Sequence, residues 1–206
     1  ERSAELIEAS GHLAAGECSE VDRQEGVQTL ASVDIEALWL LSRDPPIQSL
    51  MQLVGLRVAA GPEQSGHRVL LERLLSQQRI AVGDVLWSNL SGVAASDALT
   101  RGEVDAVFMV ASANSPGVLA LLANPAATLA SLQRTAALAE RNNYLENRLL
   151  PQDGLGPNLP RVDTPLLTTP AHLLVAQGLD PALKRIATAV AVEVHGQAGA
   201  FHRAGE

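Results

Sequence analysis

The sequence has little that could form covalent or metal cross-links, because Cys18 is its only cysteine. A single cysteine excludes an internal disulfide and a CxxC metal site. Aromatic residues make up only 2% of the chain, whereas hydrophobic residues make up 47%. The core must therefore be built from leucine, valine, isoleucine and alanine, which suits layers of helices packed on a sheet.

Positive charge is also scarce. The formal net charge is −8 over 206 residues, and a surface of that sign repels phosphate backbones, so we expect no nucleic-acid partner. One local pocket can still oppose the global field and hold a small anion. No apolar run is long enough to span a bilayer. The first residues lack the features of a signal peptide, and the chain begins at Glu1 rather than at a Met, so we expect a processed or excerpted chain.

Strand and helix patterns alternate from residue 27 onward. Strands are predicted by the apolar runs at 27–41, LRVAAG, VGDVLWSN, EVDAVFMVA and ATLASL, and two short ones by PLLTT and AHLLVA. Residues 142–161 have the Pro and Gly punctuation of a long loop. This alternation predicts an α/β fold with a mostly parallel sheet.

Helices are expected between these strands. Leu70, Leu71, Leu74 and Leu75 lie at helical spacing on one face. Other helices are predicted at 3–15, 47–53, 91–101, 135–141 and 182–194, with a further one after Ser115-Pro116. The helix at 182–194 should turn its apolar residues inward, and these are Leu183, Ile186, Val190 and Val194.

The stretch GPEQSGHR has the glycine spacing of a phosphate loop, at Gly61 and Gly66. His67 and Arg68 stand where that loop needs Lys and Ser or Thr, which argues against a nucleotide site. A helix beginning at this point still directs N–H groups and a positive dipole end toward the loop. Ser65 adds a hydroxyl, Gly66 permits close approach, His67 can donate to a carboxylate, and Arg68 can clamp one. The alternative is an ordinary strand-to-helix turn capped by Ser65.

A second polar loop follows the most apolar strand. Ser112 and Asn114 come directly after EVDAVFMVA, and ligands of open α/β sheets bind outside the carboxyl ends of strands. Their alternative role is to form the turn and cap the next helix. Tyr144 is either a contact near a ligand or a packing residue. Trp39 and Trp87 are most simply core residues, although Trp87 can also line a binding site.

Catalytic patterns are missing from the sequence. It has no G-x-S-x-G elbow, and no pair of carboxylates is spaced for acid–base work. The histidines are scattered and have no metal-ligand spacing. We therefore expect a chain that is not an enzyme and that uses no metal or cofactor.

Four segments in one order carry a family resemblance: GLRVAAGPEQSGHR, DALTRGEVDAVFMVASANSP, LAERNNYL and TPLLTTPAHLLVAQGLDPAL. Together they resemble the solute-binding proteins of TRAP transporters of the TAXI type. The family usually has Thr where this chain has His67. The resemblance implies a periplasmic-binding-protein-like fold of type II, in which a small organic anion such as glutamate binds between two α/β lobes. It also implies transfer of the ligand to TRAP permease subunits. The ligand-binding residues would be Ser65, Gly66, His67, Arg68, Ser112, Asn114 and Tyr144.

The chain is short for this family, so the first lobe should be incomplete. The expected organisation is a first-lobe remnant and hinge strand at 1–44, a second α/β lobe at 45–168, and a return to the first lobe at 169–206. The resemblance implies export to the periplasm, with the full-length protein either free or anchored to the membrane. Two other roles stay open: a sensory or regulatory domain of the same fold, and a degenerate, membrane-associated relative that acts by protein contact without a ligand.

Overall fold

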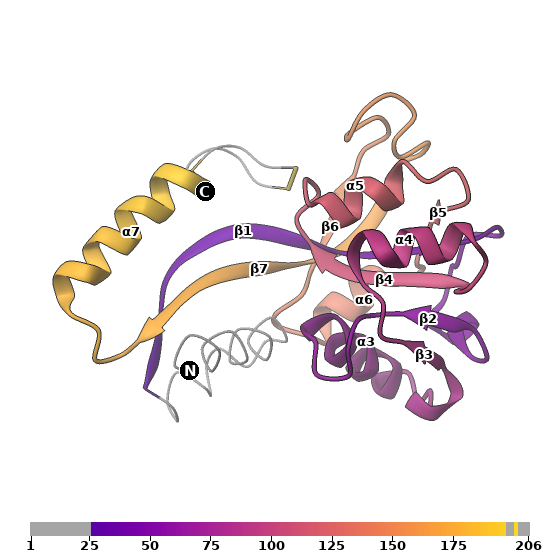
Figure 1. Ribbon diagram of the computed structural model, residues 1–206, viewed down its shortest axis with the longest axis horizontal. Helices are drawn as coiled ribbons and strands as arrows, with labels where there is room; N and C mark the ends of the chain where they lie inside the picture. The colour runs from indigo at the N-terminus through magenta and orange to yellow at the C-terminus, as the bar shows by residue number, and fades with distance from the viewer. Residues whose placement is uncertain (1–25, 197–199, 202–206) are drawn as a thin grey trace.

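The computed structural model describes residues 26–196 and 200–201, so the helix predicted at 3–15 lies outside the described residues. Seven strands form one sheet in the order β3-β2-β4-β1-β7-β6, with β5 paired to β1 (Figure 1). The strands are β1 (Val27–Ser42), β2 (Arg57–Ala59), β3 (Leu86–Ser88), β4 (Ala106–Ala111), β5 (Thr128–Leu129), β6 (Glu146–Leu150) and β7 (Thr164–Ala176).

The α/β class is confirmed, but the sheet is mixed rather than mostly parallel. Parallel pairing within the described residues joins β2 to β3 and to β4, with Val58 opposite Trp87 and Ala106. The pairs β1–β4, β1–β5, β1–β7 and β6–β7 are antiparallel. The sequence pattern does not reveal this, because a strand buried on both faces is apolar whichever way its neighbours run.

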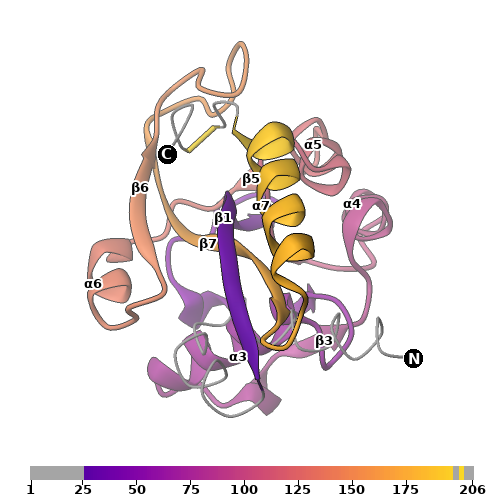
Figure 2. The ribbon, with the colours of Figure 1, turned by 90° about the vertical axis from the view of Figure 1, so that its left-hand side faces the viewer.

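Helices cover both faces of the sheet (Figure 2). On one face, α3 (Gly66–Gln77) and α6 (Thr135–Glu140) pack over a core that includes the four leucines predicted for α3. On the other, α4 (Gly92–Thr100) and α5 (Pro116–Leu122) cover a second core around Trp39. Because β1 side chains alternate between the faces, Leu38 and Leu40 join the first core and Trp39 and Leu41 the second. Two 3-10 turns, Leu50–Leu53 and Val82–Asp84, complete the connections.

Two strands differ from the sequence prediction: β7 is longer than expected, and β6 was not predicted. The two short strands expected at PLLTT and AHLLVA are one strand, β7, because Pro170 is accommodated opposite Ile35 without ending the pairing. The predicted loop at 142–161 contains β6, which pairs with β7 from Glu146 opposite Thr168 to Leu150 opposite Thr164. The β6 sequence ENRLL is mostly polar because this edge strand is largely exposed.

Beyond the sheet, β1 and β7 continue together as a two-stranded ribbon. The pairing extends from Ala37 opposite Thr168 to Val27 opposite Ala176, whereas β4 reaches only to Ala37. Helix α7 (Pro181–His195) lies beside this ribbon (Figure 1). Its Asp180 cap accepts the N–H of Ala182 at 2.7 Å.

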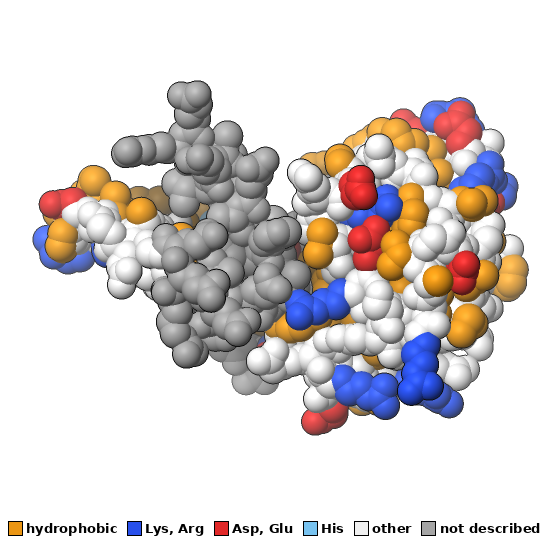
Figure 3. All heavy atoms as spheres, turned by 90° about the horizontal axis from the view of Figure 1, so that it is seen from below, with side chains coloured by type: hydrophobic (Ala, Val, Ile, Leu, Met, Phe, Trp, Pro, Cys, Tyr) orange, Lys and Arg blue, Asp and Glu red, His pale blue; other side chains and the backbone are white. Residues whose placement is uncertain are grey.

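The inward orientation predicted for the apolar side chains of α7 is wrong. Leu183, Ile186, Val190 and Val194 are all at least 50% exposed, and Ala191 is the one buried residue of the helix. Hydrophobic side chains are visible at that end of the molecule in Figure 3. The helix does have an apolar face, but within the described residues α7 contacts mainly β1, and a narrow ribbon cannot cover that face.

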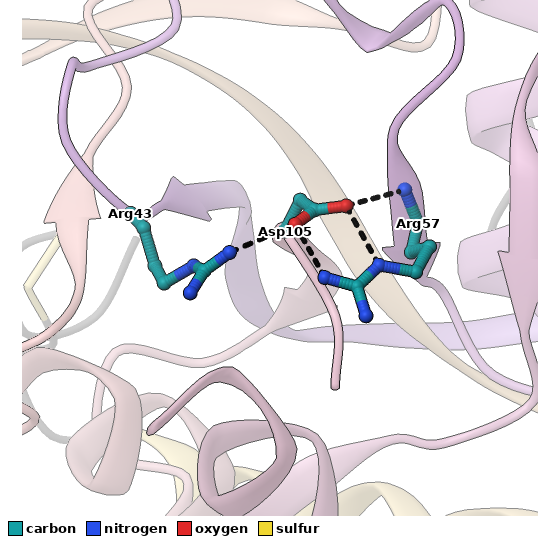
Figure 4. A network of polar contacts seen from close by, with 3 residues as sticks. All are labelled: Arg43, Arg57 and Asp105. Atoms are coloured by element: carbon teal, nitrogen blue, oxygen red, sulfur yellow. Dashed lines mark hydrogen bonds and ion pairs between the residues drawn. The ribbon is translucent and has the colours of Figure 1, made fainter. Parts of the chain in front are cut away.

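An ion-pair network ties together the starts of β2 and β4 and the end of β1 (Figure 4). Arg57 donates to both carboxylate oxygens of Asp105, at 2.9 Å from Nε and 2.7 Å from Nη2, and Arg43 Nη2 donates at 3.0 Å. The backbone N–H of Arg57 also donates to Asp105 at 3.0 Å. These arginines hold the pKa of Asp105 well below its usual range. The network lies at the opposite edge of the sheet from the carboxyl ends of β2 and β4.

Candidate ligand-binding site

Loops at the carboxyl ends of β2, β3 and β4 meet at one edge of the sheet, because the three strands are parallel. The loop after β2 is held close to the loop after β3: Ala60 N–H donates to Ser88 O at 3.3 Å and Gly61 N–H to Leu90 O at 3.0 Å. Gly61 has φ +80°, and a Cβ there would lie 2.7 Å from the hydroxyl oxygen of Ser65. The glycine therefore permits both the turn and its close contact with the start of α3.

Ser65 is the N-cap of α3. Its hydroxyl donates to Ala60 O at 3.1 Å and accepts the N–H of Arg68 at 3.3 Å. The side chain thus fixes the loop and the helix start, as the capping alternative predicted. The N–H groups of Gly66 and His67 make no hydrogen bond within the described residues, as is usual for the first turn of a helix. Two backbone donors therefore remain at this edge of the sheet.

His67 joins the start of α3 to the end of β4. Its Nδ1 accepts the N–H of Val110 at 3.1 Å. A ring nitrogen that accepts a hydrogen bond carries no proton, so the neutral ring bears its proton on Nε2. Burial lowers the pKa of His67 and favours this neutral form. His67 therefore offers one defined donor, the Nε2–H, from the same turn as the unpaired N–H groups.

Ser112 and Asn114 lie at the same edge, directly after β4. The Ser112 hydroxyl accepts the N–H of Asn114 at 3.4 Å, and its carbonyl accepts the N–H of Ser115 at 3.0 Å. Ser115 caps α5 by accepting the N–H of Val118 at 3.4 Å. Since β2 and β4 are adjacent and parallel, the structure places these residues on the loop next to the Ser65–His67 turn.

The Arg68 side chain is engaged by residues outside that turn. It is only 8% exposed, its guanidinium lies 3.8 Å from the centre of the Trp87 ring, and its Nε–H donates to Glu72. The Trp87 indole N–H donates to Val82 O at 2.9 Å. Arg68 therefore joins α3 to β3 through its cation–π contact with Trp87, and its ion pair with Glu72, one turn along α3, holds the guanidinium in place.

Tyr144 lies against the far half of α3. Its hydroxyl donates to Asn142 Oδ1 at 2.9 Å, and the Arg73 guanidinium is 5.3 Å from its ring centre. Asn142 in turn forms a two-way amide pair with Gln77. Arg73 is six residues beyond His67, which is about 9 Å along the helix axis. The described conformation thus does not bring Tyr144 together with the Ser65–His67 turn.

Sequence reasoning missed one ionisable residue at this edge, Glu36. It lies one residue beyond Ala37, the last β1 residue paired with β4, just as Ser112 lies one residue beyond its partner Ala111. By strand alternation Glu36 shares the face of Leu38, which is the face covered by α3. Burial raises the pKa of Glu36, and the charge of Asp34 raises it further. The available signal was an acid inside the apolar run DIEALWLL.

Comparison with known proteins places the chain in a family. Residues 9–191 match the NMT1-like family. The chain belongs to the NMT1-like family. No protein with a curated description matches this NMT1-like chain.

Solved structures show the fold of the NMT1-like chain. A protein from Bordetella bronchiseptica RB50 is 15% identical, with a TM-score of 0.51 over 87% of this chain and 51% of that one. An ancestral arginine-binding protein bound to arginine is 13% identical, with a TM-score of 0.50 over 88% and 63%. The periplasmic aliphatic sulphonate binding protein SsuA from Escherichia coli is 20% identical, with a TM-score of 0.42 over 58% and 39%.

The likenesses to the Bordetella bronchiseptica protein and the arginine-binding protein confirm the fold expected from the resemblance, that of the type II periplasmic binding proteins. The NMT1-like chain spans about two fifths of the length of the Escherichia coli protein and 63% of the arginine-binding protein. Two of these neighbours bear the names of binding proteins.

Among residues 26–196 and 200–201, no three His, Cys, Asp or Glu side chains gather as a metal site. In the same ranges no helix combines the length and the hydropathy required to cross a membrane.

Proposed function

We propose that this chain provides the second lobe of a solute-binding protein, and that the edge formed by Ser65–His67, Ser112 and Asn114 binds a small carboxylate. The observation that carries the proposal is the set of three neighbouring donors at the start of α3: the N–H groups of Gly66 and His67 and the Nε2–H of His67. Donors at a helix N-terminus favour an anion, because the helix dipole has its positive end there. The fold supports ligand binding at this edge, because ligands of open α/β sheets bind outside the carboxyl ends of strands.

The ligand class we favour is an amino acid such as glutamate. Glu36 adds an acceptor beside the donors. A carboxylate that is partly buried there repels a simple anion, but it can accept a hydrogen bond from an ammonium group. In an amino acid, the carboxylate can bind the donors at the start of α3 while the ammonium group binds Glu36. Arg68 and Tyr144 enter the proposal as residues outside the donor set: Arg68 holds α3 against β3, and Tyr144 packs against α3 from the loop before β6.

We further propose that the chain serves a TRAP-type system of the TAXI type in the periplasm, delivering the ligand to the permease subunits. The ordered segments from GLRVAAGPEQSGHR to TPLLTTPAHLLVAQGLDPAL support this assignment, as does the membership of the NMT1-like family. In this proposal residues 45–168 form the second lobe, and 1–44 and 169–206 belong to the first lobe and hinge. The β1–β7 ribbon, which leaves the sheet at Ala37 and Thr168, supports these boundaries.

A second role is favoured by one observation, the exposed apolar face of α7. A relative that acts by protein contact without a ligand would use such a face. The two roles differ in their response to small molecules.

A thermal-shift panel of amino acids and dicarboxylates tests the proposed function. We expect one chemical class to stabilise the chain. At a ligand concentration ten times Kd the stabilisation is about 1.4 kcal/mol, which raises Tm by about 3–6 °C for a chain of this size. His67→Ala should remove the shift, whereas the matched change His195→Ala on the exposed α7 should retain it. A contact protein without a ligand would show no shift for any compound.

A further inference from the structure

A pocket of about 270 Å³ lies far from the candidate ligand-binding site, on the face of α6 that meets the end of α3. Its walls come from α6, from the turn at Gln48 and Ser49 after β1, and from Gln78, the residue that ends α3. Helix α3 has 12 residues and is therefore about 18 Å long. Because the donor set lies at its start and this pocket at its end, the two cannot share one small ligand.

Two arginines border the pocket, Arg134 before the first residue of α6 and Arg141 after the last. Both are exposed, and neither forms an ion pair with any described residue. Among the residues that the structure describes, the other polar lining side chains are uncharged, and no carboxylate lines the pocket. In a chain whose net charge is −8, two unpaired guanidinium groups at one hollow form a local positive site.

Four apolar residues also line the pocket. Leu50 and Leu138 are buried, and Leu132 and Ala137 complete the surface. Leu50 and Leu132 also border a small apolar void in the core beneath α6. A ligand for this pocket can therefore place an apolar group on these residues and a negative charge beside the arginines.

We propose that this pocket binds a small amphipathic monocarboxylate, with its apolar body on Leu50, Leu132 and Leu138 and its carboxylate between Arg134 and Arg141. The volume supports a small molecule: at about 30 Å³ for each water-sized group, it holds about nine non-hydrogen atoms. Arginine binds a carboxylate through two parallel N–H···O bonds, and the flanking glutamine amides add uncharged donors. This site is separate from the proposed function and does not depend on it.

Hexanoate is the probe, with acetate and hexan-1-ol as matched controls that lack the tail or the charge. In ¹H–¹⁵N correlation spectra, we expect hexanoate to give saturable shifts at Gln133 and Ala137, and each control to bind at least about tenfold more weakly. The double variant Arg134→Gln/Arg141→Gln should weaken hexanoate by about tenfold. Its control, Arg161→Gln/Arg185→Gln, makes the same change of charge at exposed arginines away from the pocket and should leave Kd unchanged.

A steric variant tests the pocket without changing charge. Ala137→Phe fills the hollow and should abolish hexanoate binding, whereas Ala136→Phe adds the same ring at an exposed neighbour that does not line the pocket. The proposal is overturned if hexanoate gives no saturable shifts at Gln133 and Ala137, if Ala137→Phe binds it as the wild type does, or if hexan-1-ol binds equally well. Binding of an acidic peptide but not of hexanoate would also overturn it, in favour of a protein-docking role.

Discussion

Replacing Trp39 by alanine is expected to lower the free energy of unfolding by about 3–5 kcal/mol, the largest single effect we predict for a side chain of this fold. Trp39 lies in the central strand β1 and is fully buried. Its indole N–H donates to Ala111 O at 3.0 Å, and its ring centre is 6.2 Å from that of Phe201. Alanine would leave a cavity in a core that has few other aromatic side chains, as well as a carbonyl without its donor.

Urea denaturation followed by circular dichroism measures this loss. Trp39→Phe is the matched control, since it keeps a ring in the core and removes the indole N–H, and it should recover more than half of the lost stability. A loss below about 1 kcal/mol for Trp39→Ala would contradict the central place of this residue in the second core, because such values are typical of surface substitutions.

Replacing Asp105 by asparagine should cost about 1–2 kcal/mol at neutral pH and should change how stability depends on acid. The carboxylate joins three strands through Arg43 and Arg57 (Figure 4). Charge-assisted hydrogen bonds contribute about 1.5–3 kcal/mol each, and we expect less here because both arginines are more than 40% exposed.

The sign of the pH effect follows from the lowered pKa of Asp105. In the unfolded chain the carboxyl takes up a proton near its ordinary pKa of 3.8, while in the folded chain it stays ionised to lower pH. The stability that it contributes is present above that ordinary value and is lost as the pH falls toward the lower folded pKa.

Urea denaturation at a series of pH values measures this effect. As the pH falls from neutral into the acid range, the free energy of unfolding should decrease less steeply for Asp105→Asn than for the wild type. Asp84→Asn, an exposed aspartate in a 3-10 turn, is the control and should follow the wild type. If the free energy of unfolding of Asp105→Asn decreased with acid as steeply as that of the wild type, the network would not contribute to stability.

The sequence predicted the buried faces and the N-terminal caps of several elements correctly. The leucines of α3 and the apolar run of β4 are buried as expected, and Ser65, Ser115 and Asp180 cap their helices. These features need only periodicity and capping chemistry, which neighbouring residues determine.

Features that depend on distant partners could not be predicted in this way. The polar strand β6 exists because β7 pairs with it, and the direction of β1 depends on its neighbours in the sheet. The position of the Arg68 side chain is determined by its contacts with Glu72 and Trp87, and Trp87 lies in a different element of the sheet. Glu36 reaches the ligand edge only through the register of β1 with β4.

The most direct test of the proposed ligand edge is a ¹H–¹⁵N titration of the 206-residue chain with the compound class that stabilises it most. We predict saturable shifts centred on the amides of Gly66, His67 and Ser112, and smaller shifts at Glu36. Ala137, which lies on α6 in the separate pocket, should show none. Titration with the corresponding compound that lacks the ammonium group should give weaker shifts at Glu36. Saturable shifts that avoid Gly66 and His67, or none for any carboxylate or amino acid, would contradict the account.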